Sequence, residues 1–193
     1  MSSISEIWGT TPDERRRPYP CDDIISQPDA ALYRGITVNA SPETVFRWLC
    51  QLRVAPYSYD WIDNGGWPSP QELTPGVDDL VIGEDVMRIF RLTAFEIDRH
   101  LTLRLKRGST ASRMFGDLAV SYLVADDHGH PDRCRLLVKL VITYPRGVYG
   151  LVVRRILPWG DLIMMRRQLL NLKRLAEAAQ NQATANSISH DEK

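Results

Sequence analysis

The chain has 193 residues, 44% of them hydrophobic and 25% charged, which is the composition of one ordinary globular domain. Its 24 basic and 24 acidic residues give a formal net charge of zero, whereas a nucleic-acid-binding domain usually carries a basic excess. Cys21, Cys50 and Cys134 form no CxxC pair, so the sequence predicts buried, reduced thiols rather than a disulfide framework or a zinc site.

The first 30 residues combine several prolines with many charges, which predicts an extended N-terminal arm (1–30). No apolar run occurs between Met1 and Arg17, so we expect no secretory signal and a cytoplasmic protein. The most apolar stretch, 148–165, is broken by charged residues and a proline. It is therefore not expected to form a transmembrane segment, which needs about 20 predominantly apolar residues.

A strand is predicted over 31–40, although Arg34 interrupts the apolar face that this strand would present. A helix follows, with Ser41 as its N-cap and Pro42 at its first position, and Pro56 ends it. Its apolar face consists of Val45, Trp48, Leu49 and Leu52.

Further strands are predicted after a loop rich in proline and glycine that runs as far as Gly83. Leucines at 101, 103 and 105 alternate with polar residues, which is typical of a half-buried strand. Similar patterns predict strands over 86–90, 92–97, 117–125 and 136–142.

The end of the chain predicts a long amphipathic helix from Asp161, its expected N-cap, to Gln180. Its inward stripe recurs at steps of three and four residues and consists of Leu162, Met165, Leu169, Leu172, Ala176 and Ala179. Residues 147–157 are expected to form a separate short helix, and residues 181–193 a disordered tail.

Strands that precede a terminal helix favour an α+β fold over alternating α/β units. We therefore expect one domain over 31–180, in which a curved antiparallel sheet of five to seven strands grips the C-terminal helix. This arrangement buries the apolar face of the sheet and that of the helix against each other.

Several segments then resemble a known family. They are Trp8-Gly9 with Glu14, the helix ending Trp48-Leu49-x-Gln51-Leu52, the segment Tyr57-Ser58-Tyr59-Asp60-Trp61, Gly83-Glu84-Asp85, and the terminal Leu172-Lys173-Arg174 region. In this order they are similar to the START-like helix-grip superfamily, also called SRPBCC or polyketide cyclase/dehydrase-like. The resemblance covers about residues 8–178. It implies a cavity between sheet and helix that binds apolar small molecules.

Aromatic residues gather beside the glycine- and proline-rich loop, where a pocket mouth is expected. The candidate ligand-binding residues are Trp48, Tyr57, Tyr59, Asp60, Trp61, Trp67, Met165 and Leu169. We expect Tyr57 to be only partly buried. In the alternative interpretation, Tyr59 and Trp61 fill the core and Asp60 caps a short helix.

Motifs for other chemistry are weak. Asp60 and Asp63 are a possible acid–base pair, but carboxylates on a surface helix are usually solvated. His128 and His130 flank a glycine in a turn, where they are expected to be solvated and not to bind a metal, and His100 begins a strand from which it could face the cavity. Neither a Gly-x-Ser-x-Gly elbow nor a phosphate-binding glycine loop occurs, and no cofactor is expected.

The leading interpretation is the binding of an apolar small molecule. A polyketide cyclase- or dehydratase-like enzyme on the same scaffold remains open, as does a peripheral lipid carrier. Arginines and lysines along the terminal helices either contact anionic lipid or form hydrated helix faces.

Overall fold

The computed structural model describes residues 3–59, 66–127 and 130–191, and the side chains of α6 as far as residue 186. Over these residues the sheet has seven strands, in the order β1-β2-β7-β6-β5-β4-β3. The strands are β1 (Ile7–Trp8), β2 (Ala30–Val38), β3 (Asp85–Val86), β4 (Phe90–Glu96), β5 (His100–Leu105), β6 (Asp117–Asp126) and β7 (Cys134–Thr143). Neighbouring strands are antiparallel, except that β1 runs parallel to β2.

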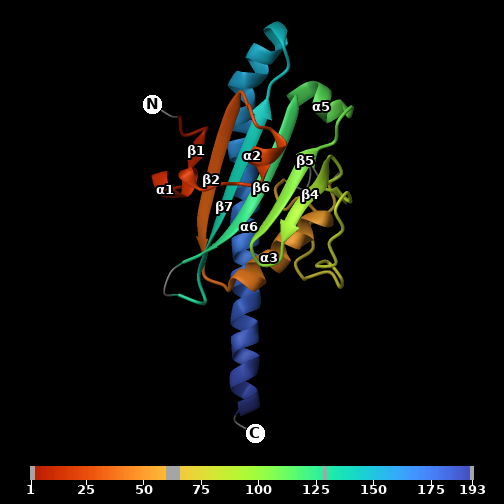
Figure 1. Ribbon diagram of the computed structural model, residues 1–193. Helices are drawn as coiled ribbons and strands as arrows, with labels where there is room; N and C mark the ends of the chain where they lie inside the picture. The colour runs from red at the N-terminus through yellow and green to blue at the C-terminus, as the bar shows by residue number, and fades with distance from the viewer. Residues whose placement is uncertain (1–2, 60–65, 128–129, 192–193) are drawn as a thin grey trace.

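The helices lie on both faces of this sheet. They are α1 (Pro12–Arg16), α2 (Cys21–Ile24), α3 (Pro42–Cys50), the 3-10 turn η1 (Gln51–Arg53), α5 (Thr110–Phe115) and α6 (Gly147–Asp191). Figure 1 shows α6 running behind the sheet and projecting past it at the C-terminal end, while α2 lies in front. The predicted α+β fold, a sheet gripping a long C-terminal helix, is therefore confirmed.

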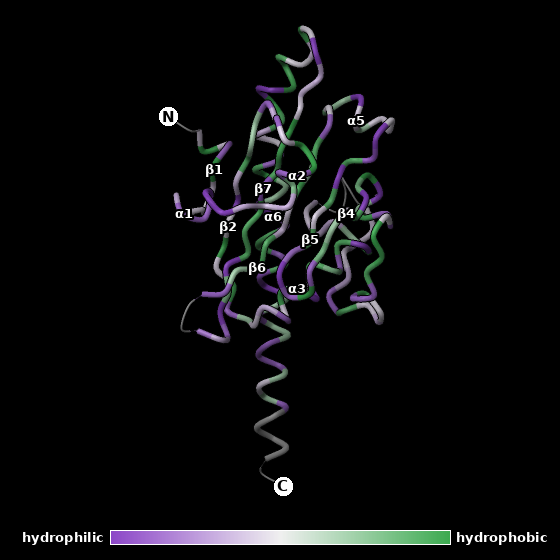
Figure 2. The backbone as a smooth tube through the Cα atoms, viewed as in Figure 1, coloured by the Kyte–Doolittle hydropathy of each residue, from purple (hydrophilic) through white to green (hydrophobic). Residues whose placement is uncertain are grey.

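Successive side chains of each strand point to opposite faces of the sheet, and both faces are buried. On β6, Val120 and Tyr122 point toward the core shared with α3 and α6, whereas Ala119 joins a second cluster around α2. In the tube coloured by hydropathy, hydrophobic residues gather in and around the sheet, and hydrophilic residues alternate with weakly hydrophobic ones where α6 leaves it (Figure 2).

Two helix starts follow from their sequence. Ser41 caps α3 as predicted, because its hydroxyl accepts a hydrogen bond from the Thr44 amide at 3.2 Å, with Pro42 at the first helical position. At α1, Thr11 and Glu14 form a capping box that the sequence analysis did not identify.

Three element predictions need correction. Helix α6 begins at Gly147 and passes through Pro158, so residues 147–157 form no separate helix and Asp161 is not an N-cap. A proline removes one helical hydrogen bond, yet α6 continues through Pro158, which is buried. Residues 86–90 do not form one strand: Val86 ends β3, Phe90 begins β4, and residues 87–89 form the turn between them, where Met87 and Arg88 adopt left-handed φ values.

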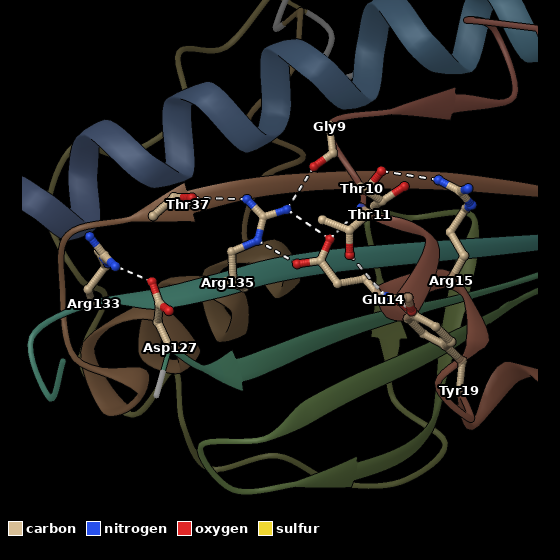
Figure 3. Close-up of polar contacts among 10 residues, drawn as sticks. All are labelled: Gly9, Thr10, Thr11, Glu14, Arg15, Tyr19, Thr37, Asp127, Arg133 and Arg135. Carbon is tan, nitrogen blue, oxygen red and sulfur yellow. Dashed lines mark hydrogen bonds and ion pairs between the residues drawn. The ribbon is translucent and has the colours of Figure 1, made fainter. Parts of the chain in front are cut away.

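The N-terminal arm is attached to the sheet through Arg135 of β7 (Figure 3). Its guanidinium donates to both carboxylate oxygens of Glu14, at 2.7 and 3.0 Å, to the Gly9 carbonyl at 2.7 Å and to the Thr37 hydroxyl at 2.9 Å. Arginine suits this place because its planar fork can serve several acceptors at once.

The arm contains β1, α1 and α2, and Tyr19 and Cys21 are buried against the outer face of the sheet. At the other end of the chain, helix α6 continues through residues 181–191. The division into an arm, a domain over 31–180 and a tail remains a prediction.

Candidate functional site

Trp48 and Tyr57 pack against each other beneath the loop that follows η1. Their ring centroids are 6.2 Å apart and their planes meet at 88°, which is an edge-to-face contact. Trp48 is 3% exposed and Tyr57 is 1% exposed. The expectation that Tyr57 is only partly buried was therefore wrong, because its ring enters the core next to α3.

The Tyr57 hydroxyl fixes the neighbouring loop. It donates to the Pro70 carbonyl at 2.8 Å and accepts from the side-chain amide of Gln51 at 2.9 Å. The oxygen of the same amide accepts from the Thr74 backbone at 3.1 Å. The Tyr57 hydroxyl and the Gln51 side-chain amide are thus paired by neutral groups.

Gln168 connects α6 with three other segments. Its amide oxygen accepts from the Tyr122 hydroxyl at 2.8 Å, and its amide nitrogen donates to the Pro56 carbonyl at 2.6 Å. The same nitrogen lies 3.6 Å from the sulfur of Met87. We call Pro56, Tyr57, Met87, Tyr122 and Gln168 the Gln168 junction.

One turn along α6, the side-chain amide of Asn171 donates to the Tyr57 carbonyl at 2.9 Å. Two neutral amides of the helix therefore hold two successive carbonyls of the same loop. Burial raises the pKa of Tyr122 well above its usual range, so its phenol stays protonated and acts as a donor.

Backbone strain is concentrated on the segments that meet at the junction. Tyr57, Met87 and Arg88 have φ values of 57°, 46° and 62°, in the left-handed region that bulky residues rarely adopt. Each such residue costs about 1–3 kcal/mol and persists only where surrounding contacts enforce it.

Trp48 also carries an unsatisfied donor. Its indole nitrogen is buried and has no hydrogen-bond partner among the described residues. A buried N–H without an acceptor costs about 1–3 kcal/mol, so an oxygen atom brought to this place would be stabilised.

The other predicted site residues fall in several places. Leu169 is fully buried in the cluster that contains Trp48 and Tyr57, and Met165 is half-buried against that cluster. Tyr59 lies below the Arg167 guanidinium, 5.9 Å from its ring centroid, and Trp67 is 74% exposed. Asp60 and Trp61 lie outside the described residues, as do Asp63 and His128.

Other candidate chemistry lies apart from the junction. His100 shares the outward parity of Thr102, whose hydroxyl bonds to Ser121 on the α2 side, so it does not face α6. Burial lowers its pKa. The described part of the chain holds no group of three or more potential metal ligands, and none of its helices could span a membrane.

The three cysteines are buried and free of disulfides. Burial raises the pKa of Cys21 to about 11 and those of Cys50 and Cys134 to about 12. A thiol with so high a pKa is a poor nucleophile near neutral pH, so these residues serve packing.

Two hollows lie at the surface, away from the predicted aromatic residues. One, of about 480 Å³, is lined by Arg91, Thr93, Arg104, Leu105, Lys106, Arg107, Gly108 and Ser109. The other, of about 360 Å³, lies between α5 and the start of α6. Carboxylates neutralise part of the positive charge of the first hollow, since Asp85 pairs with Lys106 and Asp117 with Arg104.

Sequence reasoning missed two buried polar contacts of α6. Arg34 of β2, 1% exposed, donates to one carboxylate oxygen of Asp161 at 2.7 and 3.1 Å and to the Ser5 carbonyl at 2.7 Å. The signal was present, because Arg34 interrupts an apolar strand face. Gln168 likewise lies between Met165 and Leu172 on the inward stripe, where a polar residue needs a buried partner.

Comparisons with known proteins bear mainly on the fold. No family model and no curated protein matches this sequence. Solved structures do match. A START superfamily protein from Mycobacterium smegmatis is 17% identical, with a TM-score of 0.45 over 79% of this chain and 98% of that one.

Protein MLL2253 from Mesorhizobium loti is 13% identical, with a TM-score of 0.47 over 77% of this chain and 97% of that one. The di-domain ARO/CYC BexL from the BE-7585A biosynthetic pathway is 12% identical, with a TM-score of 0.48 over 76% of this chain and 46% of that one. The chain is thus similar in structure to START and ARO/CYC proteins. Its fold assignment rests on its own strand order and on α6.

Proposed function

We propose that this protein binds an apolar small molecule between the sheet and α6, with the Gln168 junction as the place of entry. The observation that carries the proposal is the strain at Tyr57, Met87 and Arg88, on the two segments that Gln168 joins to the helix. Strained residues of this kind cluster at ligand clamps and switch regions, because moving them releases stored free energy.

The side chains around the junction suit a mainly apolar ligand. Trp48 and Tyr57 offer aromatic surface, and the thioethers of Met87 and Met165 adapt to varied shapes. The unpartnered indole N–H of Trp48 would donate to one oxygen of the ligand, so a ring system with a carbonyl or hydroxyl group fits best.

Binding is favoured over catalysis by the neutrality of the junction. Its polar side chains, with the adjoining Gln51 and Asn171, are amides and phenols, and no carboxylate or imidazole belongs to this set. General acid–base chemistry needs a group that titrates near the working pH. The cyclase-like alternative would therefore need a group from outside the set.

Native mass spectrometry of the purified full chain, followed by titration with Nile red, tests the proposal. Nile red is an apolar dye with one carbonyl oxygen. Replacing Trp48→Phe keeps an aromatic ring but removes the N–H, and should weaken dye binding up to about tenfold, the worth of one hydrogen bond. Trp159→Phe, which changes an exposed tryptophan of α6, is the matched control and should leave binding unchanged.

The proposal fails if both variants bind the dye as the parent does, or if the parent binds no dye and carries no co-purified molecule. Urea midpoints of both variants must be measured in parallel, so that a loss of binding in Trp48→Phe is not confused with unfolding.

A further inference from the structure

The first half of α6 is apolar on two opposite sides. Its inner side, with Val153, Pro158 and Leu169, packs against the sheet. Its outer side exposes a row of large hydrophobic residues at steps of three and four, which are Val148, Val152, Ile156, Trp159 and Ile163. We call these five residues the outer stripe. It is about 22 Å long, at 1.5 Å per residue.

Surface contacts join the start of α6 to neighbouring elements. Arg154 pairs with Asp29 at 3.3 Å and lies 5.1 Å from the Tyr144 ring, and Tyr149 donates to the Met114 carbonyl of α5 at 3.1 Å. The outer stripe is therefore a fixed surface of the folded domain. Monomeric soluble proteins rarely expose a continuous apolar row of this size unless it binds something.

The charges beside the stripe are of one sign. Arg155, Arg166 and Arg167 are exposed, and none of them forms an ion pair with a described residue. Between Gly147 and Ala176 the sequence has a single acidic residue, Asp161, and that carboxylate is turned inward onto Arg34. The stripe therefore has a basic border without neutralising carboxylates.

From this pattern we infer that the outer stripe of α6 docks on an anionic lipid surface. Hydrophobic side chains would enter the boundary between headgroups and acyl chains, and the flanking arginines would contact phosphate groups, as in helices that lie in the plane of a membrane. The inference stands independently of the proposed ligand site.

A second copy of this chain fits the surface less well. Pairing two outer stripes, parallel or antiparallel, would gather the arginines of both helices around one interface with no carboxylate on the stripe to pair them. Like charges placed together oppose association, whereas an anionic bilayer complements them.

Sedimentation of the full chain with vesicles tests the inference. The protein should bind vesicles of phosphatidylcholine mixed with phosphatidylserine, should bind pure phosphatidylcholine weakly, and should be released by added salt. Ile156→Ser should lower the partition coefficient about tenfold, because a large aliphatic side chain no longer leaves water. Arg155→Gln and Arg166→Gln should each lower it about fivefold.

Matched controls exist in the turn between β4 and β5. Ile97 is 68% exposed, against 63% for Ile156, and Arg99 is exposed as well. Ile97→Ser and Arg99→Gln should bind vesicles as the parent does. Circular dichroism must show that each variant is folded, which exposed positions allow.

Three results would overturn the inference. The first is absence of binding to anionic vesicles, and the second is equal losses for Ile156→Ser and Ile97→Ser. The third is a dimer of the parent in sedimentation equilibrium that Ile156→Ser converts to a monomer, because the stripe would then belong to a second copy of the chain.

Discussion

Helix α6 is joined to the rest of the protein by two buried polar contacts that lie about two turns apart and differ in kind. At Asp161 the contact is a charge pair with Arg34, closed over by the Ser5 carbonyl of the arm. At Gln168 it is a neutral network with Tyr122, Pro56 and Met87. A buried charge must keep its partner, whereas a neutral amide can exchange one acceptor or donor for another at low cost.

The two contacts therefore have different roles along the helix. The charge pair fixes α6 to the first long strand and to the arm, and the amide network holds a loop and a turn that are both strained. Movement for ligand entry is therefore expected at Gln168 and not at Asp161. Variants at each contact can break or sharpen this contrast.

The largest effect is expected from Arg34→Ala. It leaves the Asp161 carboxylate buried without its partner, and breaking such a pair costs about 3–5 kcal/mol. Urea denaturation at neutral pH measures the loss. The double variant Arg34→Met with Asp161→Leu removes both charges and should recover most of the stability. If it is as unstable as Arg34→Ala, the charge pair is not the reason for the loss.

The pH dependence of Arg34→Ala has a defined sign. Burial raises the pKa of Asp161 and Arg34 opposes that effect, so removing Arg34 raises the folded-state pKa further above the unfolded value. The folded variant then binds a proton more readily than the unfolded chain. The contribution of Asp161 to the variant's stability should rise as the pH falls through the folded-state pKa, so the deficit relative to the parent should shrink in acid.

Leu169→Ala comes next and serves as an apolar reference between the two polar contacts. Leu169 is fully buried between α6 and the sheet, so the cavity left behind should cost about 2–5 kcal/mol at any pH. A loss near zero, measured by urea denaturation, would mean that α6 does not pack on the sheet as described. Leu170→Ala, at an exposed neighbouring position, is the control.

The sequence predicted the elements whose pattern is local. Alternating leucines marked β5, Ser41-Pro42 marked the start of α3, and the stripe at Leu169 and Leu172 marked the inward side of α6. The sequence did not predict the buried contacts of Asp161 and Gln168. The partner of each residue lies far away in the chain, and a single polar residue in an apolar stripe does not indicate which residue it contacts. Asp161 was expected as an N-cap because Pro158 and Gly160 indicate a helix start, but α6 passes through both residues.

The sequence predicted that aromatic residues gather at the candidate site, but it did not predict which of their side chains are buried. Trp48 and Tyr57 do meet, yet Tyr57 is buried because its hydroxyl finds Gln51 and Pro70, two partners that spacing along the chain does not reveal. Trp67, from the same aromatic group, is exposed instead. Aromatic content alone therefore indicates where rings gather, and packing decides which of them enter the core.

Tyr122→Phe probes the neutral contact and should cost about 1–3 kcal/mol, because the Gln168 amide oxygen loses its donor while staying buried. Adding Gln168→Leu removes the other partner and should restore part of the loss, although the Pro56 carbonyl then loses its donor. Thermal unfolding of the two single variants and the double variant measures the coupling. Additive losses would show that the two side chains do not interact.

The smallest effect is expected at Glu177, a carboxylate near the end of the helical core that contrasts with Asp161. It accepts from the Asn39 amide at 2.8 Å and from the Lys173 ammonium. Partial burial alone would raise its pKa, but these hydrogen bonds outweigh burial and hold the pKa below its usual value. The folded state therefore binds its proton less readily than the unfolded chain. The stabilisation is present above the unfolded-state pKa and is lost as the pH falls through the folded-state pKa.

Glu177→Gln should consequently cost at most about 1 kcal/mol near neutral pH, since the pair is partly hydrated. The difference from the parent should vanish in acid, where the parent's carboxylate is protonated too. Urea midpoints of the parent and the variant, measured from neutral to acidic pH, give the stability difference near neutrality and the pH at which it vanishes. For both Glu177→Gln and Arg34→Ala, the stability deficit relative to the parent should shrink in acid, but the causes are opposite. With Glu177→Gln, the parent loses the stabilisation that its ionised Glu177 provides. With Arg34→Ala, the variant loses the destabilisation that its unpaired Asp161 carboxylate causes, because that carboxylate becomes neutral.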